Sequence, residues 1–70
     1  MITYEKLWKR MKEKGITQYR LHVEGISNST LTRLKRNKSV NMETIDKLCN
    51  ILQCNVGDIL EHREDQVEGE

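Results

Sequence analysis

Hydrophobic residues recur along most of this chain at the three- and four-residue intervals that indicate helices. The clearest pattern begins at Asn41 and runs to about Gln53, with inward positions at Met42, Ile45, Leu48, Cys49 and Leu52. Weaker versions predict further helices at about residues 4–14, 18–23, 28–36 and 56–61. No segment is predicted as a strand. The pattern therefore predicts an all-α fold, a bundle of five helices.

Four polar residues stand where four of these helices would begin. Each has a side-chain oxygen that can accept a hydrogen bond from a free backbone N–H of the first helical turn; they are Thr3, Thr17, Ser27 and Asn41. Glycines at positions 15 and 25 would end the first helix and supply the turn before the third. The other predicted core residues are Tyr4, Leu7, Trp8, Met11, Leu21, Leu31, Leu34, Val56, Ile59 and Leu60. The core is therefore small and mostly aliphatic.

Charged residues are distributed unevenly along the chain. Its 70 residues are enough for one small domain and carry a net charge of +1. Residues 1–60 hold eleven Lys or Arg against six Asp or Glu, whereas residues 61–70 hold one Arg against five acids. We expect a folded, basic domain over residues 1–61 and an acidic, disordered tail over residues 62–70.

Several classes of protein are disfavoured by the sequence. It has neither an 18-residue apolar run nor a signal-peptide pattern, so a soluble, cytoplasmic protein without membrane contact is expected. The spacing of Cys49 and Cys54 matches no common zinc motif, and reduced thiols in or near the core are expected, with redox sensing or metal binding as the alternatives. No set of nucleophile, base and orienting group can be assembled. We expect no enzyme activity, cofactor, metal or small-molecule ligand.

The third predicted helix has two chemically different faces. Leu31 and Leu34 would pack inward, while the opposite stripe consists of five polar or guanidinium side chains: Asn28, Ser29, Thr32, Arg33 and Arg36. A solvated helix face usually mixes Glu with Lys, and this stripe has no acidic member. The pattern favours an anionic partner and predicts a helix that lies in a DNA groove.

The two short helices around Gly25 match the helix-turn-helix unit. Around them the chain resembles the lambda-repressor-like helix-turn-helix regulators, also called the Cro or XRE family, in a compact single-domain branch. The resemblance covers about residues 2–61 and is carried by three runs: Thr17-Gln18-x-x-Leu21; Gly25-Ile26-Ser27-x-Ser29-Thr30-Leu31-x-Arg33-Leu34-x-Arg36-Asn37-Lys38; and Met42-Glu43-x-x-x-x-Leu48-Cys49 with Asn55-Val56-Gly57-Asp58-Ile59-Leu60.

This resemblance implies a five-helix bundle whose helix from Asn28 to Arg36 reads the major groove of double-stranded DNA. The implied base-reading residues are Asn28, Ser29, Thr32 and Arg33. The implied phosphate-binding residues are Thr17, Gln18, Ser27, Arg36, Asn37, Lys38, Ser39 and Asn41. Arg33 can bond guanine O6 and N7, and Asn28 can pair with adenine N6 and N7. The implied function is a transcriptional regulator, expected to be a repressor that binds DNA as a homodimer.

The chain departs from the family pattern at the turn. The stretch from Leu21 to Gly25 is one residue shorter than usual, and His22 stands where most relatives carry a small Ala. A packed neutral ring, a phosphate donor and a pH-sensitive hinge are the three interpretations of His22. The alternative function is a protein-interaction module, such as an antitoxin, with DNA binding secondary or lost. Its binding surface would then include Val23, Val40 or Tyr19.

Overall fold

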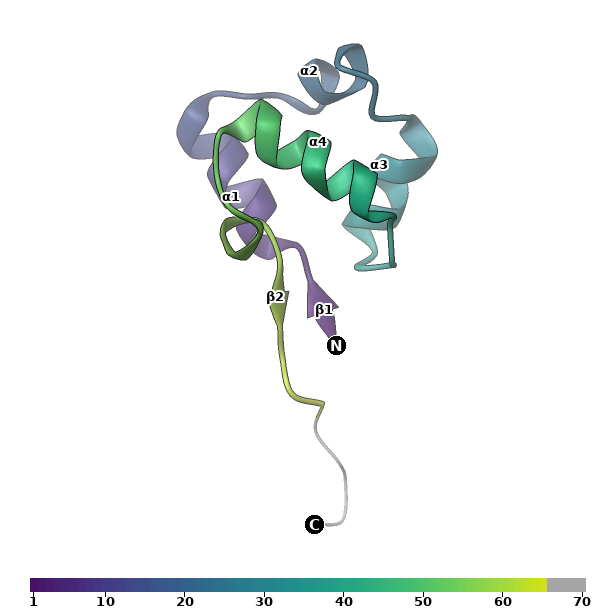
Figure 1. Cartoon of the computed structure of the whole chain (residues 1–70). Coiled ribbons are helices and arrows are strands. Elements are labelled where there is room, and N and C mark those ends of the chain that lie inside the picture. The colour runs from purple at the N-terminus through teal and green to yellow at the C-terminus, as the bar shows by residue number, and fades with distance from the viewer. Residues whose placement is uncertain (66–70) are drawn as a thin grey trace.

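Four α-helices and one short antiparallel sheet make up the structure, a computed structural model that describes residues 1–65 (Figure 1). In chain order the elements are β1 (Ile2–Thr3), α1 (Glu5–Lys14), α2 (Gln18–Val23), α3 (Asn28–Lys35), α4 (Met42–Leu52), the 3-10 turn η1 (Val56–Asp58) and β2 (Glu61–His62). The all-α helix-turn-helix class is thus confirmed, but the sheet was not expected.

Helix α4 supplies the centre of the core, as its pattern predicted. Leu48 and Leu52 are completely buried, and Ile45 is nearly so. The remaining core residues come from the other three helices, from the residues just before α1 and α3, and from the C-terminal segment: Tyr4, Leu7, Met11, Leu21, Ile26, Leu31, Leu34 and Ile59. In the view of Figure 1, α1 and α3 lie on opposite sides of α4. Each of α1, α2 and α3 therefore contributes at least one buried side chain to a core that it shares with α4.

Three of the four predicted helix caps are confirmed. Thr17 Oγ1 accepts a hydrogen bond from Arg20 N–H at 3.1 Å. Ser27 Oγ accepts from Thr30 N–H at 3.2 Å, and Asn41 Oδ1 accepts from Thr44 N–H at 2.8 Å. These bonds satisfy donors that the first helical turn leaves free.

Thr3, the fourth predicted cap, does not cap α1. The capping position belongs to Tyr4, which makes no side-chain capping bond, and Thr3 lies in β1 opposite Glu61 of β2. Thr3 is only 2% exposed, and its hydroxyl oxygen has no hydrogen-bond partner within residues 1–65. The prediction was wrong because the pairing of β1 with β2 joins segments that are almost 60 residues apart, and two-residue strands leave no pattern in the sequence.

The prediction of a fifth helix at residues 56–61 is also wrong. Only the single 3-10 turn Val56–Asp58 forms, and Asn55 N–H donates to Asp58 Oδ2 at 3.0 Å across it. The chain then extends into β2, and Ile59, which lies between η1 and β2, is completely buried in the core. Val56 and Met42, both expected in the core, are 44% and 68% exposed. Each stands at the first position of its element, and the nearest buried residue follows it three positions later, at Ile45 and Ile59.

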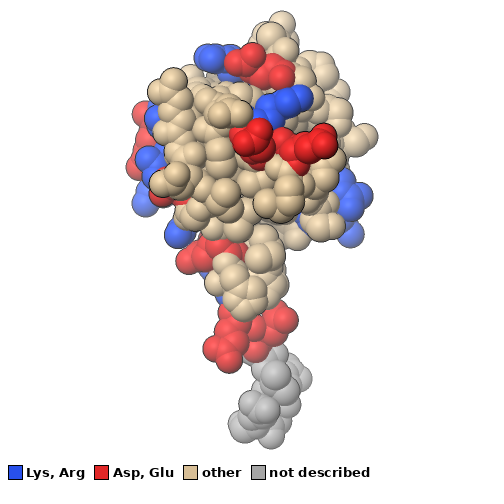
Figure 2. Space-filling view, in the orientation of Figure 1, with Lys and Arg blue, Asp and Glu red and all other residues tan. Residues whose placement is uncertain are grey.

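The segment after β2 lies beside the N-terminus. Arg63 N–H donates to the carbonyl of Met1 at 2.8 Å, and Arg63 Nη2 lies 2.6 Å from Glu5 Oε2. The N-terminal ammonium lies 3.0 Å from Asp65 Oδ1. Figure 2 shows the acidic side chains gathered along this descending segment. Residues 62–65, assigned by the sequence to an acidic tail, thus contact the N-terminal segment, whereas residues 66–70 lie outside the described residues.

Candidate nucleic-acid interface

The turn between α2 and α3 fixes the angle at which α3 leaves the core. Gly25 has φ of 106°, a backbone conformation that other residues rarely adopt, and a Cβ there would lie 3.0 Å from Lys47 Nζ. Ile26 follows with a side chain only 3% exposed, and its N–H donates to the Leu21 carbonyl at 3.0 Å. The turn is therefore anchored at both of its ends, and the polar side of α3 faces outward.

The predicted division of α3 into two faces is present in the structure. Leu34 is fully buried and Leu31 nearly so, whereas the polar stripe is exposed along its whole length: Asn28, Ser29, Thr32, Arg33 and Arg36. No carboxylate occurs between Glu24 and Glu43, and that interval contains four cations, namely Arg33, Lys35, Arg36 and Lys38. By contrast, acidic and basic side chains are mixed on the face of the body seen in Figure 2.

A hollow of about 470 Å³ separates α2 from α3 and brings predicted site residues together. Gln18 lies at its α2 side, opposite Asn28 and Thr32 of α3. Tyr19, suggested above for a protein-binding surface, and Lys35, which the sequence did not single out, also line it. Lys35 could have been found from the helical period, because it follows Thr32 by three residues and Asn28 by seven.

His22 lines the same hollow and is exposed. The packed-ring interpretation of this residue was therefore wrong. Leu21 occupies the buried position on α2, so the next residue along the helix points away from the core. His22 shares this hollow with Lys35 and Asn28. The interpretations of His22 as a phosphate donor or a pH-sensitive hinge remain predictions.

A second hollow, of about 440 Å³, lies between α3 and the start of α4. Arg33 and Thr30 line it from α3, and Ser39, Val40 and Asn41 line it from the loop. Arg33 Nε donates to the Ser39 carbonyl at 2.9 Å. Within residues 1–65, no hydrogen bond or ion pair engages its two Nη groups. The structure thus places the predicted base reader Arg33 beside two predicted phosphate-binding residues.

The loop after α3 is held by backbone and side-chain hydrogen bonds. Asn37 adopts the left-handed conformation with φ of 56°, and Lys38 N–H reaches back to the Arg33 carbonyl at 2.8 Å. Asn37 Oδ1 accepts from the backbone N–H of Tyr4 at 3.1 Å. Asn37, predicted to bind phosphate, therefore already uses its carboxamide oxygen within the fold. Arg36, Lys38 and Ser39 remain exposed.

Tyr4 adds a contact that the sequence did not reveal. Its hydroxyl donates to the Lys38 carbonyl at 2.9 Å, although its ring is almost completely buried. Burial raises the pKa of the Tyr4 phenol, and the positive charge of Arg33 partly opposes this shift. The phenol, protonated at neutral pH even at its ordinary pKa of about 10, is thus a hydrogen-bond donor there, and the raised pKa extends this state to higher pH.

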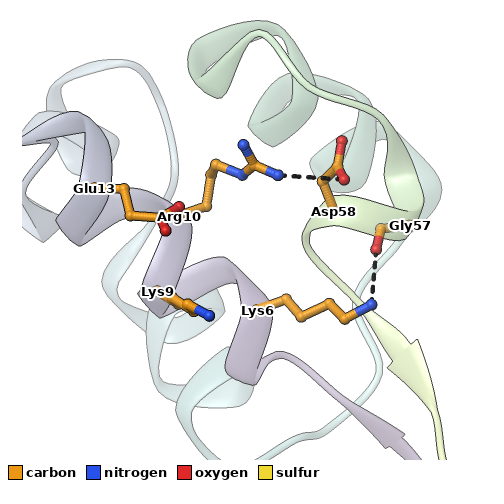
Figure 3. A pocket seen from close by; sticks show the side chains of 6 residues that line it. All are labelled: Lys6, Lys9, Arg10, Glu13, Gly57 and Asp58. Atoms are coloured by element: carbon orange, nitrogen blue, oxygen red, sulfur yellow. Dashed lines mark hydrogen bonds and ion pairs between the residues drawn. The ribbon is translucent and has the colours of Figure 1, made fainter.

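A third hollow, of about 270 Å³, lies between α1 and η1 (Figure 3). Lys6 Nζ donates to the Gly57 carbonyl at 3.3 Å, and Arg10 Nη2 lies 3.3 Å from Asp58 Oδ1. These two cations hold η1 against α1. None of the predicted DNA-binding residues lines this hollow, so it belongs to the scaffold.

Cys49 and Cys54 are free thiols, both half-buried, and burial raises the pKa of Cys49, with smaller contributions from Cys54 and Asp46. Residues 1–65 contain no group of three or more side chains placed to bind a metal. Among the described helices, none has the length and apolar character needed to cross a bilayer.

Comparison with known proteins gives three matches. The profile of the Cro/C1-type HTH DNA-binding domain matches residues 6–65. An uncharacterized HTH-type transcriptional regulator of Bacillus subtilis (strain 168), YozG, is 38% identical over 47 residues, which are 64% of this chain and 56% of that protein. This chain thus spans little more than half the length of that relative. The crystal structure of the transcriptional regulator VanUg, form II, superposes with a TM-score of 0.80 at 33% identity, covering 86% of this chain and 81% of that one.

These matches agree with the residues that suggested the family and with the geometry of α2, Gly25 and α3. The profile spans all four helices but for the first residue of α1, together with the turn and the loop after α3. The chain belongs to the family of Cro/C1-type helix-turn-helix DNA-binding domains.

Proposed function

We propose that this protein is a cytoplasmic, sequence-specific DNA-binding transcriptional regulator, and that it represses by occupying a promoter. Residues 1–61 would form the DNA-binding domain, with α3 in the major groove. The observation that carries the proposal is the exposed polar face of α3, which has no carboxylate and lies between two hollows. A helix with this face suits the width and the negative potential of the groove.

Asn28 and Arg33 would read bases, together with the hydroxyls of Ser29 and Thr32. Arg33 uses Nε to hold the Ser39 carbonyl, so its two Nη groups remain to form a fork toward guanine O6 and N7. Asn28 stands at the start of α3, where the carboxamide can pair with adenine N6 and N7. Each good bidentate pair contributes about 1–3 kcal/mol of discrimination between bases.

Phosphate contacts would position the domain without specifying sequence. Arg36 and Lys38 supply exposed positive charge, and Gln18 lies at the start of α2 beside the hollow that contains Asn28. The side chains of Thr17, Ser27 and Asn41 already cap helices, so their contribution would be to orient the N–H groups of the first turn toward phosphate oxygens. Salt should weaken binding, because phosphate neutralisation releases counterions.

We propose a homodimer as the DNA-binding form. A single small module buries only about 600–1,000 Å² of its surface on DNA, which limits its specificity. Two copies on half-sites about 34–36 Å apart would double the number of base contacts. A two-fold symmetric binding sequence is the corresponding prediction.

Selection from a random duplex pool at physiological salt, followed by sequencing, tests the proposal. We expect enrichment of a two-fold symmetric motif. Asn28→Ala should then weaken binding to that motif by about 1–3 kcal/mol and relax the preference at one base position. Asn50→Ala is the matched control, because Asn50 is an exposed amide near the end of α4, in a different hollow. Equal binding by both variants and by the unchanged protein would remove Asn28 as a base reader.

A protein partner is the second candidate, and one observation favours it. Tyr19 and Val23 lie four residues apart on α2 and are 75% and 62% exposed, which is high for apolar side chains. In that case, the selection would enrich no sequence although the protein is folded. Val40, the third residue suggested for such a surface, is half-buried against the core.

A further inference from the structure

Tyr4 connects two parts of the chain that are more than 30 residues apart. Its backbone N–H donates to Asn37 Oδ1 at 3.1 Å, and its hydroxyl donates to the Lys38 carbonyl at 2.9 Å. The ring itself is only 3% exposed, so the core fixes the position of the hydroxyl. One buried residue at the start of α1 thus holds two consecutive residues of the exposed loop after α3.

The bond to Lys38 determines the direction of the next backbone donor. The Lys38 carbonyl and the Ser39 N–H belong to one planar, trans peptide group, so they point in opposite directions. Because the carbonyl points toward buried Tyr4, the Ser39 N–H points away from it. Within residues 1–65 this N–H has no acceptor. Ser39 is exposed, and its own carbonyl accepts from Arg33 Nε at 2.9 Å.

We propose that the Tyr4 hydroxyl is a positioning group for DNA binding: by holding the Lys38 carbonyl, it directs the Ser39 backbone N–H toward a DNA phosphate. This inference rests on the proposed function. The loop is thereby ordered before DNA arrives, and binding does not need to restrict it. Arg33 lies on the other side of Ser39, so the same loop also supports a predicted base reader. Tyr4 itself does not touch DNA.

The raised pKa of the phenol agrees with this role. Burial raises the pKa of Tyr4, and the opposing effect of Arg33 reflects the closeness of the phenol to this guanidinium. The hydroxyl, which is protonated at neutral pH in any environment of ordinary pKa, therefore continues to donate to Lys38 into the alkaline range.

Tyr4→Phe removes the hydroxyl and keeps the buried ring. We expect it to weaken binding to a duplex that carries the enriched motif by about three- to tenfold, the effect of losing one ordered hydrogen bond. Ile59→Val is the matched control, since Ile59 is fully buried beyond η1 and such a change destabilises the fold to a similar extent without touching the loop. Both variants are compared well below their unfolding temperatures.

A series of duplexes, each with one phosphate replaced by a neutral methylphosphonate, separates positioning from general destabilisation. In the unchanged protein, we expect weaker binding when the phosphate contacted by Ser39 N–H is replaced. In Tyr4→Phe this loss should shrink at that phosphate alone, whereas Ile59→Val should keep the pattern of the unchanged protein. A uniform loss at all phosphates, or unchanged affinity of folded Tyr4→Phe, would overturn the inference while leaving the proposed function intact.

Hydrogen exchange in the unchanged protein tests the inference without any variant. The Ser39 amide should exchange rapidly in the free protein and become protected on the duplex. An amide that stays unprotected in the complex would overturn the assignment of a phosphate to Ser39. Failure of the unchanged protein to bind any duplex would instead overturn the proposed function.

Discussion

Two residues other than glycine, Asn37 and Gln53, adopt left-handed backbone conformations within residues 1–65, and replacing each by Gly separates two effects. They have φ of 56° and 51°, and both stand at helix ends. Asn37 Oδ1 accepts a hydrogen bond from Tyr4 N–H, whereas the Gln53 side chain makes no hydrogen bond to the described residues. Gly relieves the backbone strain at both positions but removes a hydrogen bond only at Asn37.

The two substitutions should change the free energy of unfolding in opposite directions. A left-handed conformation costs an ordinary residue about 1–2 kcal/mol, and the greater freedom of Gly in the unfolded chain offsets part of the relief. Gln53→Gly should therefore raise the free energy of unfolding by about 0.5–1 kcal/mol. Asn tolerates this conformation, so the relief at Asn37 is small. The unpaired, part-buried Tyr4 N–H then dominates, and Asn37→Gly should lower the free energy of unfolding by about 1–2 kcal/mol.

Urea titration followed by circular dichroism measures both changes, and thermal unfolding supports it. In a domain of this size, Gln53→Gly should raise the Tm by about 2–8 °C, and Asn37→Gly should lower it by about 4–16 °C. Asn37→Asp is the rescue variant, because it keeps an oxygen acceptor for Tyr4 N–H near the N-terminus of α1. The reasoning is refuted if Asn37→Gly stabilises the protein as Gln53→Gly does.

Three further predictions concern the core and alkaline pH. Leu48→Ala should lower the free energy of unfolding by about 2–5 kcal/mol, and Met42→Ala by less than about 0.5 kcal/mol, because Leu48 is fully buried and Met42 is 68% exposed; equal urea midpoints would contradict this. Thr3→Val should raise the free energy of unfolding by about 1 kcal/mol, since it replaces a buried hydroxyl that has no hydrogen-bond partner within residues 1–65. A Tm lower than that of the unchanged protein would show that the hydroxyl does make a hydrogen bond. The raised pKa of Tyr4 contributes stability that is fully present below its ordinary value of about 10 and is lost as pH rises through the native pKa. Urea midpoints between about pH 8 and pH 11 should therefore fall less in Tyr4→Phe than in the unchanged protein, and parallel curves would contradict the shift.

Local chemistry explains what could be predicted from the sequence. Thr17, Ser27 and Asn41 cap their helices through bonds to N–H groups three residues ahead, so the interaction and its signal lie in the same short stretch. The two faces of α3 follow from the helical period alone, as does the central position of α4. The polar face of α3 can therefore be predicted from the sequence without any tertiary contact.

Contacts between distant segments explain what could not be predicted. The sheet pairs Thr3 with Glu61, which converts a predicted cap into a buried strand residue and replaces the end of the predicted fifth helix. The direction of α2 exposes His22, although its ring could have packed. Neither the pairing of β1 with β2 nor the exposure of His22 leaves a periodic signal in the sequence, because each depends on which surfaces meet after the chain folds.

The sequence by itself determined the helices, three of their caps and the non-acidic face of α3, since these depend on residues within one or two helical turns. Only the tertiary structure decided how the loop after α3 is held. Tyr4 reaches Lys38 across 34 residues, and the carboxamide oxygen of Asn37 accepts a hydrogen bond from the Tyr4 backbone N–H. These bonds form only when the core brings the start of α1 beside the end of α3. No pattern of neighbouring residues predicts that these two segments lie side by side.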